Sequence, residues 1–210
     1  PTADVVSVAE EMDLIVALDW MMLEQVCAFF GAHRELDGCA VSVNFSARQF
    51  LAPDAERRVL GTLERHGLAP TRLKLELTER VLAGDIRRVR AVMEALAARG
   101  VEFYLDDFGT GYSNLSSVVS LPLQYVKVDR SLLEAATNGG GGALLLRAVV
   151  ETFRAMGRGI LLEGVETPEQ YALACTLRAD RLQGYYLARP MPGEELCALM
   201  RSGARRTRRT

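Results

Sequence analysis

The sequence is poor in the residues that build disulfide frameworks and histidine-based metal sites. Its 210 residues include four cysteines and two histidines. The cysteines are widely spaced in mostly apolar surroundings and form no C-x-x-C pair, which indicates buried thiols in a reducing cytosol. Neither His33 nor His66 ends a strand-like run, so a histidine-based zinc site is not expected. The cysteines are Cys27, Cys39, Cys175 and Cys197.

The chain also has little net charge and no long apolar run. Lysine and arginine total 25 against 27 acidic residues, a net charge of -2, so nothing in the bulk composition predicts binding to DNA or RNA. No uninterrupted apolar stretch approaches the roughly 18 residues of a membrane span. We therefore expect a soluble, cytoplasmic domain, and the sequence leaves open whether a parent protein is tethered to a membrane.

The two ends of the chain carry few structural signals. Pro1 follows neither an initiator methionine nor a signal-peptide pattern, which indicates that it lies inside a longer protein. The last ten residues, RSGARRTRRT at 201–210, are interpreted as a basic, solvated and mobile tail. Because 49% of the residues are hydrophobic and 25% are charged, we expect one globular domain between these ends.

Six short runs rich in β-branched and aromatic residues alternate with longer segments of helical period. This alternation predicts repeated βα units and a parallel sheet. The strand-like runs are 39–45, 73–79, 101–107, 124–130, 159–166 and 180–186. The predicted helices are 8–30, 52–66, 85–99, 143–157 and 167–177, the last opened by a capping Thr167 and by Pro168. The NGGGG stretch at 138–142 is read as a flexible loop between a strand and a helix.

Polar side chains, most of them acidic, end all six strand-like runs. In a parallel α/β barrel the carboxyl ends of all strands open on one face, so residues far apart in sequence would meet there. A closed barrel needs eight strands, and we expect the missing ones before Pro1 or replaced by an unrecognised segment. The polar residues are Asn44, Glu76, Glu79, Asp106, Asp107, Lys127, Asp129, Glu163, Glu166 and Gln183.

Hard oxygen ligands dominate this set and favour Mg²⁺ or Mn²⁺. Two such ions about 4 Å apart could clamp the attacking and leaving oxygens of a phosphoryl transfer. Adjacent carboxylates at Asp106 and Asp107 would then serve as ligands rather than repel each other. Lys127 could hold a hydroxide or a phosphate oxygen, and Glu163 could accept a proton or complete the second metal site.

The aspartate pair and the loop after it also allow plainer interpretations. Alone, Asp106 and Asp107 would be read as a solvated turn, because aspartate is favoured in turns. The loop FGTGYSNL at 108–115 could be a tight turn, or its Gly109 and Gly111 could make it a mobile lid.

The chain resembles the EAL-domain family of cyclic-di-GMP phosphodiesterases along almost its whole length. The resemblance implies a TIM-like barrel, usually with one reversed strand, which linearises cyclic-di-GMP to pGpG with two Mg²⁺ or Mn²⁺ ions. The matching motifs are SVNFSARQF, LKLELTE, YLDDFGTGYSNL, LPLQYVKVDRS, LEGVET and LQGYYLARPMP.

The resemblance also implies roles for individual residues. Asn44, Glu76 and Asp106 would bind the first metal, and Asp106 with Asp107 would hold the second, with Glu163 close by. Lys127 would position the attacking water. Glu79 would anchor the loop after the aspartate pair, and Glu166 would support the site. Gln183, Pro190 and Met191 would lie near the substrate.

One departure from the family keeps two functions open. The Glu-x-Leu motif that names the family, and an arginine near it, would precede Pro1, because residues 1–15 resemble the segment that follows them. The chain is therefore interpreted as an N-terminally truncated EAL domain. It would be a phosphodiesterase or, with impaired catalysis, a cyclic-di-GMP-binding regulatory module. A third hypothesis, an unrelated metal-dependent barrel enzyme acting on a small phosphorylated or carboxylated metabolite, stays open.

The resemblance further predicts partners of the domain. Members of this family commonly pair through the face near the lid loop, so we expect a homodimer. Sensory or cyclase domains are expected to flank the domain in the parent protein.

Overall fold

The fold is built on one parallel sheet. The computed structural model describes residues 8–9, 12, 14–78, 85–109 and 118–202. Within these ranges six strands pair in chain order, and every pair is parallel. This confirms the predicted sheet, with shorter strands at several ends. The strands are β1 (Val41–Asn44), β2 (Leu73–Thr78), β3 (Glu102–Phe108), β4 (Tyr125–Val128), β5 (Gly159–Leu162) and β6 (Arg181–Leu182).

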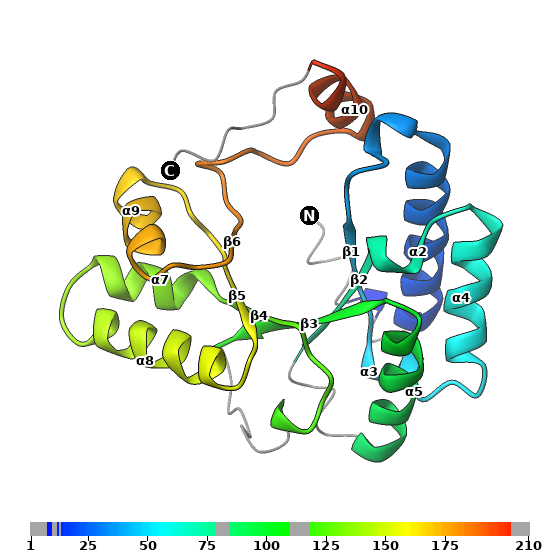
Figure 1. Cartoon of the computed structure of the whole chain (residues 1–210), viewed down its shortest axis with the longest axis horizontal. Coiled ribbons are helices and arrows are strands. Elements are labelled where there is room, and N and C mark those ends of the chain that lie inside the picture. The colour runs from blue at the N-terminus through cyan, green and yellow to red at the C-terminus, as the bar shows by residue number, and fades with distance from the viewer. Residues whose placement is uncertain (1–7, 10–11, 13, 79–84, 110–117, 203–210) are drawn as a thin grey trace.

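The sheet is curled into a half-barrel with helices outside it (Figure 1). The first and last strands, β1 and β6, stand at opposite edges and do not pair with each other in the described part of the chain. The reversed strand that the resemblance implies is not among the six described strands. All six carboxyl ends therefore open on one side, which is the arrangement that the strand-end residues require.

The helices form two groups around the sheet (Figure 1). One group flanks β1 to β3, the other flanks β4 to β6, and the final helix stands near the start of the first group. The first group is α2 (Ile15–Ala32), α3 (Ala47–Phe50), α4 (Ala55–Arg65) and α5 (Ile86–Ala98), with 3₁₀ turns at Arg34–Leu36 and Pro70–Arg72. The second is α7 (Arg130–Thr137), α8 (Gly142–Ala155) and α9 (Pro168–Thr176), and the final helix is α10 (Gly193–Arg201).

Among the helices in the described part of the chain, five were predicted and have adjusted ends, and three were not predicted. Thr167 accepts a hydrogen bond from Gln170 N and caps α9, as its sequence indicated. The unpredicted helices are α3, α7 and α10. The predicted loop is present at 138–141, but it joins α7 to α8 rather than a strand to a helix, and α8 already begins at Gly142. Arg201 also belongs to α10 rather than to a tail, and residues 203–210 lie outside the described part.

Helix α2 combines membrane-like composition with core packing. By length and a mean hydropathy of 1.4 it could cross a membrane, although Asp19 and Glu24 interrupt its apolar sequence. Core helices of soluble proteins and N-terminal signal sequences share this length and composition, so these two properties are weak evidence for a membrane span, and 28% of α2 is buried in the described structure. Its buried side chains, which include Trp20 and Leu23, belong to the core.

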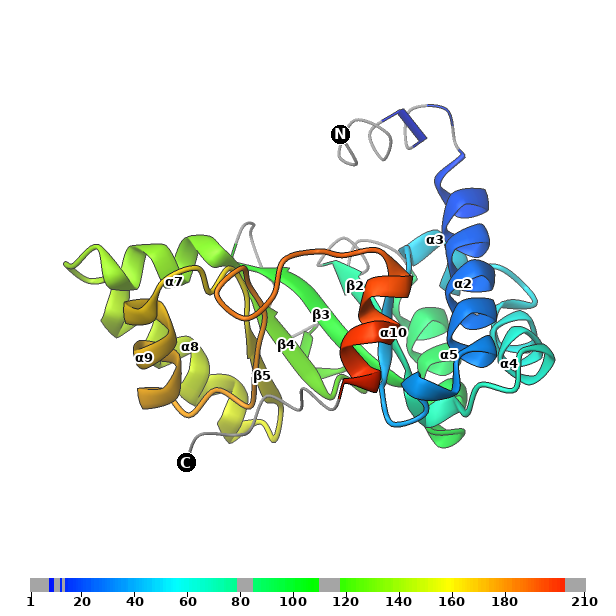
Figure 2. The same cartoon turned by 90° about the horizontal axis from the view of Figure 1, so that it is seen from above.

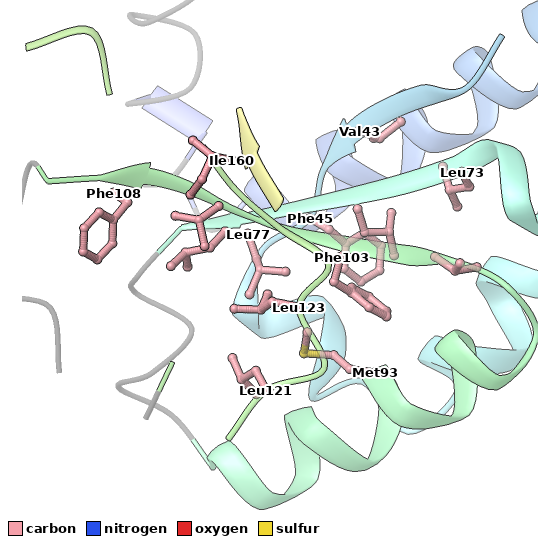
Figure 3. Packing of buried hydrophobic residues seen from close by; sticks show 14 of the residues in the cluster. Val43, Phe45, Leu73, Leu77, Met93, Phe103, Phe108, Leu121, Leu123 and Ile160 are labelled. Carbon is pink, nitrogen blue, oxygen red and sulfur yellow. The ribbon is translucent and has the colours of Figure 1, made fainter. Parts of the chain in front are cut away.

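The main core lies between the sheet and the helices (Figure 3). Outward-facing strand residues such as Phe103 and Leu105 are fully buried there. Phe50 of α3 joins them, with ring centroids 4.8 Å from Phe45 and 6.0 Å from Phe103. Each such side chain contributes roughly 1.5–3 kcal/mol when buried, which fixes the sheet and hence the residues on its inner face.

The segment after β6 returns the chain to its first helices. Figures 1 and 2 show residues 183–192 running from β6 to α10, which contacts the 3₁₀ turn after α2. Gly193 lies against Phe29 of α2, since a β-carbon there would be 2.4 Å from the ring. Arg201 Nη1 donates to Glu35 Oε1 at 2.5 Å. We call residues 183–202 the return segment, and it links the two edges of the half-barrel.

Candidate active site

The candidate site is centred on a buried ammonium group at the open mouth of the sheet. Lys127 Nζ lies 2.7 Å from Glu76 Oε2, 2.7 Å from Asp106 Oδ1 and 2.9 Å from Glu163 Oε1. These four residues come from β2, β3, β4 and the end of β5, so the sheet brings together positions 76 to 163. Inner-face residues near the carboxyl ends of neighbouring strands converge in this way.

Burial and charge oppose each other at this cluster. The Lys127 side chain is 5% exposed, and burial works against its charge, but Asp106 and Glu76 outweigh burial and raise its pKa above the ordinary value. Burial raises the pKa of Glu163, and the charge of Lys127 only partly offsets that rise. One ammonium faces three carboxylates, so the cluster keeps an excess of negative charge that suits a cation.

A β-bulge explains how two consecutive aspartates reach one site. Side chains alternate along a regular strand, so neighbours cannot both face inward. The β3–β4 register shifts between Leu105 and Phe108, so that Asp106 and Asp107 together oppose the single residue Lys127. Asp107 adopts a left-handed conformation, with φ of 57°, and its amide donates to Asp106 Oδ1 at 3.0 Å. Such strain is concentrated at functional sites.

Three carboxylates in the site are spaced to hold a metal ion. Oxygen atoms of Asp106, Asp107 and Glu163 all lie within 4.8 Å of one another. Burial raises the pKa of Asp107, and the neighbouring charges of Asp106 and Asp129 raise it further. A divalent cation would relieve this repulsion, and oxygen-only donors match Mg²⁺ or Mn²⁺. The residues present therefore fit the implied metals in donor chemistry.

The remaining residues of the sequence-based set lie at varied distances from this cluster. Asn44 is exposed on β1 and is the ladder partner of Glu76. Glu166 is exposed at the mouth, 3.6 Å from Arg130 Nη1, and has no contact with Lys127 among the described contacts. Glu79 and Gly111 lie outside the described residues. The substrate-binding set falls in the return segment: Gln183, Pro190 and Met191.

Gly109 has a steric role beyond the mobility that the sequence suggested. Its φ is 112°, which side chains rarely adopt. A β-carbon at this position would also come within 2.5 Å of Leu132 Cδ1 on α7. Glycine therefore lets the chain leave the bulge and pass closely over α7.

Sequence reasoning overlooked Arg130 at the rim of the site. Its Nη2 donates to Glu134 at 2.7 Å, and its Nη1 lies 3.6 Å from Glu166. The signal was weak, because an arginine one residue past a strand end is common and its partners lie four and 36 positions away. Arg130 is the first residue of α7, a helix that was not predicted.

Comparisons with known proteins agree with this geometry. The model of the EAL domain family matches residues 1–190. MucR of Pseudomonas aeruginosa, a bifunctional diguanylate cyclase and cyclic di-GMP phosphodiesterase, is 35% identical over 195 residues, which are 90% of this chain and 28% of MucR. The cyclic di-GMP phosphodiesterase PdeL of Escherichia coli is 31% identical over 207 residues, 97% of this chain and 57% of PdeL.

The fold is equally similar to a solved structure. The MucR phosphodiesterase in complex with c-di-GMP superposes with a TM-score of 0.83 at 35% identity, over 92% of this chain and 79% of that one. The chain thus spans only part of the relatives named above, but the match covers most of its own length. By sequence, fold and the arrangement of its strand-end residues, the chain belongs to the EAL domain family.

Proposed function

We propose that this domain hydrolyses one phosphodiester bond of cyclic-di-GMP to give linear pGpG, with two Mg²⁺ or Mn²⁺ ions as cofactors. The observation that carries the proposal is the contact of Lys127 with Glu76, Asp106 and Glu163, beside the bulged Asp107. MucR and PdeL, which are named as phosphodiesterases of this dinucleotide, support the choice of substrate.

The metal ligands in this proposal are the mouth carboxylates. Asp106, Asp107 and Glu163 would hold one ion between them, and Asp106 would share the second with Glu76 and Asn44. A bound divalent ion supplies charge stabilisation to a phosphoryl oxygen and acidifies a bound water. The carboxylates keep that charge fixed, since strands on both sides anchor them.

Lys127 and Glu163 would handle the attacking water. The Lys127 ammonium is buried, and three carboxylates hold it in place and occupy its three N–H donors. Metal ions that bind these carboxylates would leave one N–H of the fixed ammonium to donate to the water. Glu163 has a raised pKa, which brings a carboxylate closer to the range in which it accepts a proton at neutral pH. Water enters from the mouth, where Asp107 is exposed.

The direct test is product analysis with purified protein. Incubation with Mn²⁺ and cyclic-di-GMP is expected to give pGpG by chromatography, and added EDTA is expected to stop the reaction. Cyclic-di-AMP, which has the same backbone and different bases, is the matched substrate control. If calorimetry shows that the domain binds cyclic-di-GMP and no turnover is detected, the proposed function would change from an enzyme to a receptor module. Turnover of a small phosphorylated metabolite, without response to cyclic dinucleotides, would overturn both.

We also propose partners for the whole protein. MucR is named as a diguanylate cyclase as well as a phosphodiesterase, and this chain matches 28% of the length of MucR. We therefore propose that regulatory domains flank this domain in the whole protein. A homodimer in the cytoplasm is proposed as the working assembly. Sedimentation at high protein concentration tests it, and a monomeric mass would contradict it.

A further inference from the structure

The inner face of the sheet carries two tyrosines beneath the candidate site. Tyr104 lies two residues before Asp106 on β3, and Tyr125 lies two residues before Lys127 on β4. Because side chains alternate along a strand, each tyrosine shares the inner face with the charged residue that follows it. The two tyrosines are ladder partners, and their ring centroids are 4.9 Å apart. They form one row of the inner face with Glu76, the ladder partner of Tyr104, and this row lies below Asp106 and Lys127.

A third side chain covers these rings from the edge strand β6. The guanidinium carbon of Arg181 lies 4.3 Å from the Tyr125 ring centroid and 5.4 Å from that of Tyr104. Arg181 also donates a hydrogen bond to the Tyr104 hydroxyl, which donates to Glu102 at 3.2 Å. Tyr104 is 2% exposed while Arg181 is exposed, so the guanidinium shields the rings on the open side of the half-barrel.

Gly159 provides the space that this layer occupies. It is the ladder partner of Tyr125, and a β-carbon at this position would lie 2.4 Å from Cε1 of that ring. A larger residue would push the ring out of place. Barrels of this type usually fill their interior layers with branched aliphatic side chains. Here a glycine admits an aromatic ring instead.

We propose that Tyr104, Tyr125 and Arg181 form a floor that positions Lys127 and Asp106 for the reaction. Lys127 pairs with Leu161, and Leu161 pairs with Arg181, so one row of the sheet joins the floor to the ammonium. Close-packed rings restrict the side chains above them and exclude water from that side. The inference rests on the proposed function, because the geometry held by the floor is that of the hydrolytic site.

The two lysines of the chain provide a direct reporter of this floor. Lys74 and Lys127 are the only lysines in the sequence, and both are buried. Lys74 Nζ lies 2.8 Å from Glu102, which also accepts the Tyr104 hydroxyl, whereas Lys127 stands on the other side of the floor. Lysine side chains labelled with nitrogen-15 therefore give two ammonium signals, and a Lys74→Arg variant assigns them.

The main test compares Arg181→Gln with Arg147→Gln, a change in an exposed arginine of α8. In metal-free Arg181→Gln we expect the Lys127 ammonium signal to broaden beyond detection, since the group loses its fixed position. The Kd for Mn²⁺ measured by calorimetry should rise about fivefold, and kcat should fall roughly tenfold with KM changed less than about twofold. Arg147→Gln should leave all of these at wild-type values.

Tyr104→Phe and Tyr104→Leu separate the ring from its hydroxyl. The phenylalanine variant keeps the ring, so the Lys127 signal and kcat should stay near wild type while the Lys74 signal shifts. The leucine variant should lose the Lys127 signal and most of kcat. The proposed floor would be overturned if Arg181→Gln and Tyr104→Leu kept the Lys127 signal, the Mn²⁺ affinity and the kcat of wild type. This holds even if the unfolding midpoint falls in these variants.

Failure of the floor and failure of the proposed function give different results. If the wild type hydrolyses cyclic-di-GMP and Arg181→Gln does so at the same rate with an unchanged Lys127 signal, only the floor is wrong. If the wild type neither binds Mn²⁺ nor hydrolyses the dinucleotide, the proposed function is wrong. Even in that case, the Lys127 signal of the metal-free variants shows whether the floor positions the Lys127 ammonium.

Discussion

The ammonium of Lys127 holds together three carboxylates that would otherwise repel one another. Its ammonium lies within 2.9 Å of an oxygen of Glu76, Asp106 and Glu163, and each of those side chains is at most 16% exposed. Removal of one partner from a buried ion pair leaves the remaining charge without compensation. The lysine therefore contributes to folding as well as to the proposed chemistry.

We predict that Lys127→Met destabilises the metal-free protein by about 3 kcal/mol, because three carboxylates then share a site without a cation. Urea unfolding measures the loss. Added Mn²⁺ should restore part of it, since a divalent ion replaces the lost positive charge. A variant as stable as wild type without metal would show that these carboxylates are not ionised together.

Asp106 has two tasks, as a partner of Lys127 and as a proposed ligand of both ions. We predict that Asp106→Asn lowers kcat for cyclic-di-GMP by at least about 100-fold, because one charged oxygen is lost at the centre of the site. Steady-state hydrolysis with Mn²⁺ measures this. The matched control is Asp85→Asn at the start of α5, where asparagine caps a helix as well as aspartate does. A near-normal rate in Asp106→Asn would contradict the shared ligand.

The sequence alone was enough to identify several residues of the site, but not the contacts between them. Strand periodicity and polar strand ends indicated Glu76, Asp106, Lys127 and Glu163, which the structure brings together. The same reasoning could not find Arg181, because its contacts are with tyrosines far earlier in the chain, a hydrogen bond to Tyr104 77 positions away and stacking over Tyr125. Contacts of that kind depend on the curl of the sheet, which no local pattern encodes.

At the scale of elements, the bulge in β3 reconciles two demands on one strand. The side chains of Asp106 and Asp107 both lie at the mouth of the sheet, while those of Leu105 and Phe108 both belong to the core. The Phe108 ring packs edge-on against Phe153 of α8, with centroids 4.7 Å apart. A regular strand would turn Phe108 inward, so the extra residue restores the outward face after the site.

We predict that the conformation of Asp107 limits its substitutions. Asp107→Asn should be at least as stable as wild type without metal, because asparagine tolerates the left-handed region and removes the charge that Asp106 and Asp129 repel. Asp107→Val should cost about 1–2 kcal/mol more, since a β-branched residue is strained there. Urea unfolding of both variants without metal is the measurement. Equal stabilities would argue against the bulge geometry.

Helices α2 and α4 are joined by an ion pair whose contribution depends on pH. Glu24 accepts from Arg65 and His66 at 2.7 Å, and these hydrogen bonds, His66 first, lower its pKa to about 2 from 4.5. A depressed folded pKa stabilises the fold above the unfolded value and loses that effect as pH falls through the folded one. The contribution is therefore complete above about pH 4.5 and lost toward pH 2.

We predict that Glu24→Gln lowers the unfolding midpoint in urea at pH 6, and that the difference from wild type shrinks steadily between pH 4.5 and pH 2.5. The matched control is Glu56→Gln, an exposed position in the first turn of α4. A difference that is constant over this pH range would mean that the Glu24 carboxylate gains nothing from its partners.

The elements themselves were only partly predictable. Long periodic segments such as α5 and α8 were identified within a few residues, because their apolar positions repeat at helical spacing. Helix α7 was missed because it begins at once after β4, where the strand pattern runs on into Arg130. Helix α10 was missed because prolines and glycine precede it and an arginine-rich stretch follows it.

For the whole molecule, metal binding should stabilise the folded sheet, because it links neighbouring strands. The proposed ligands come from separate strands, so an ion that binds the folded state alone stabilises it by mass action. We predict that Mn²⁺ at about 100 times its Kd raises the thermal unfolding midpoint by roughly 5–10 °C, which corresponds to about 2.7 kcal/mol. Differential scanning calorimetry measures the shift, and EDTA should reverse it.

The control for this prediction is Asp106→Asn, in which the Mn²⁺-dependent shift should disappear while the midpoint without metal is retained within a few degrees. A shift of equal size in wild type and in Asp106→Asn would place the stabilising ion elsewhere on the molecule.

The return segment makes α10 an indicator of how far the half-barrel is open. It starts from the edge strand β6 and ends against Phe29 and Glu35 beside the opposite edge. Any breathing that widens the mouth must draw α10 away from those two residues. A ligand that binds across the mouth should reduce this widening and therefore slow amide hydrogen exchange in α10. Exchange in α10 would then report ligand binding from the opposite edge of the sheet.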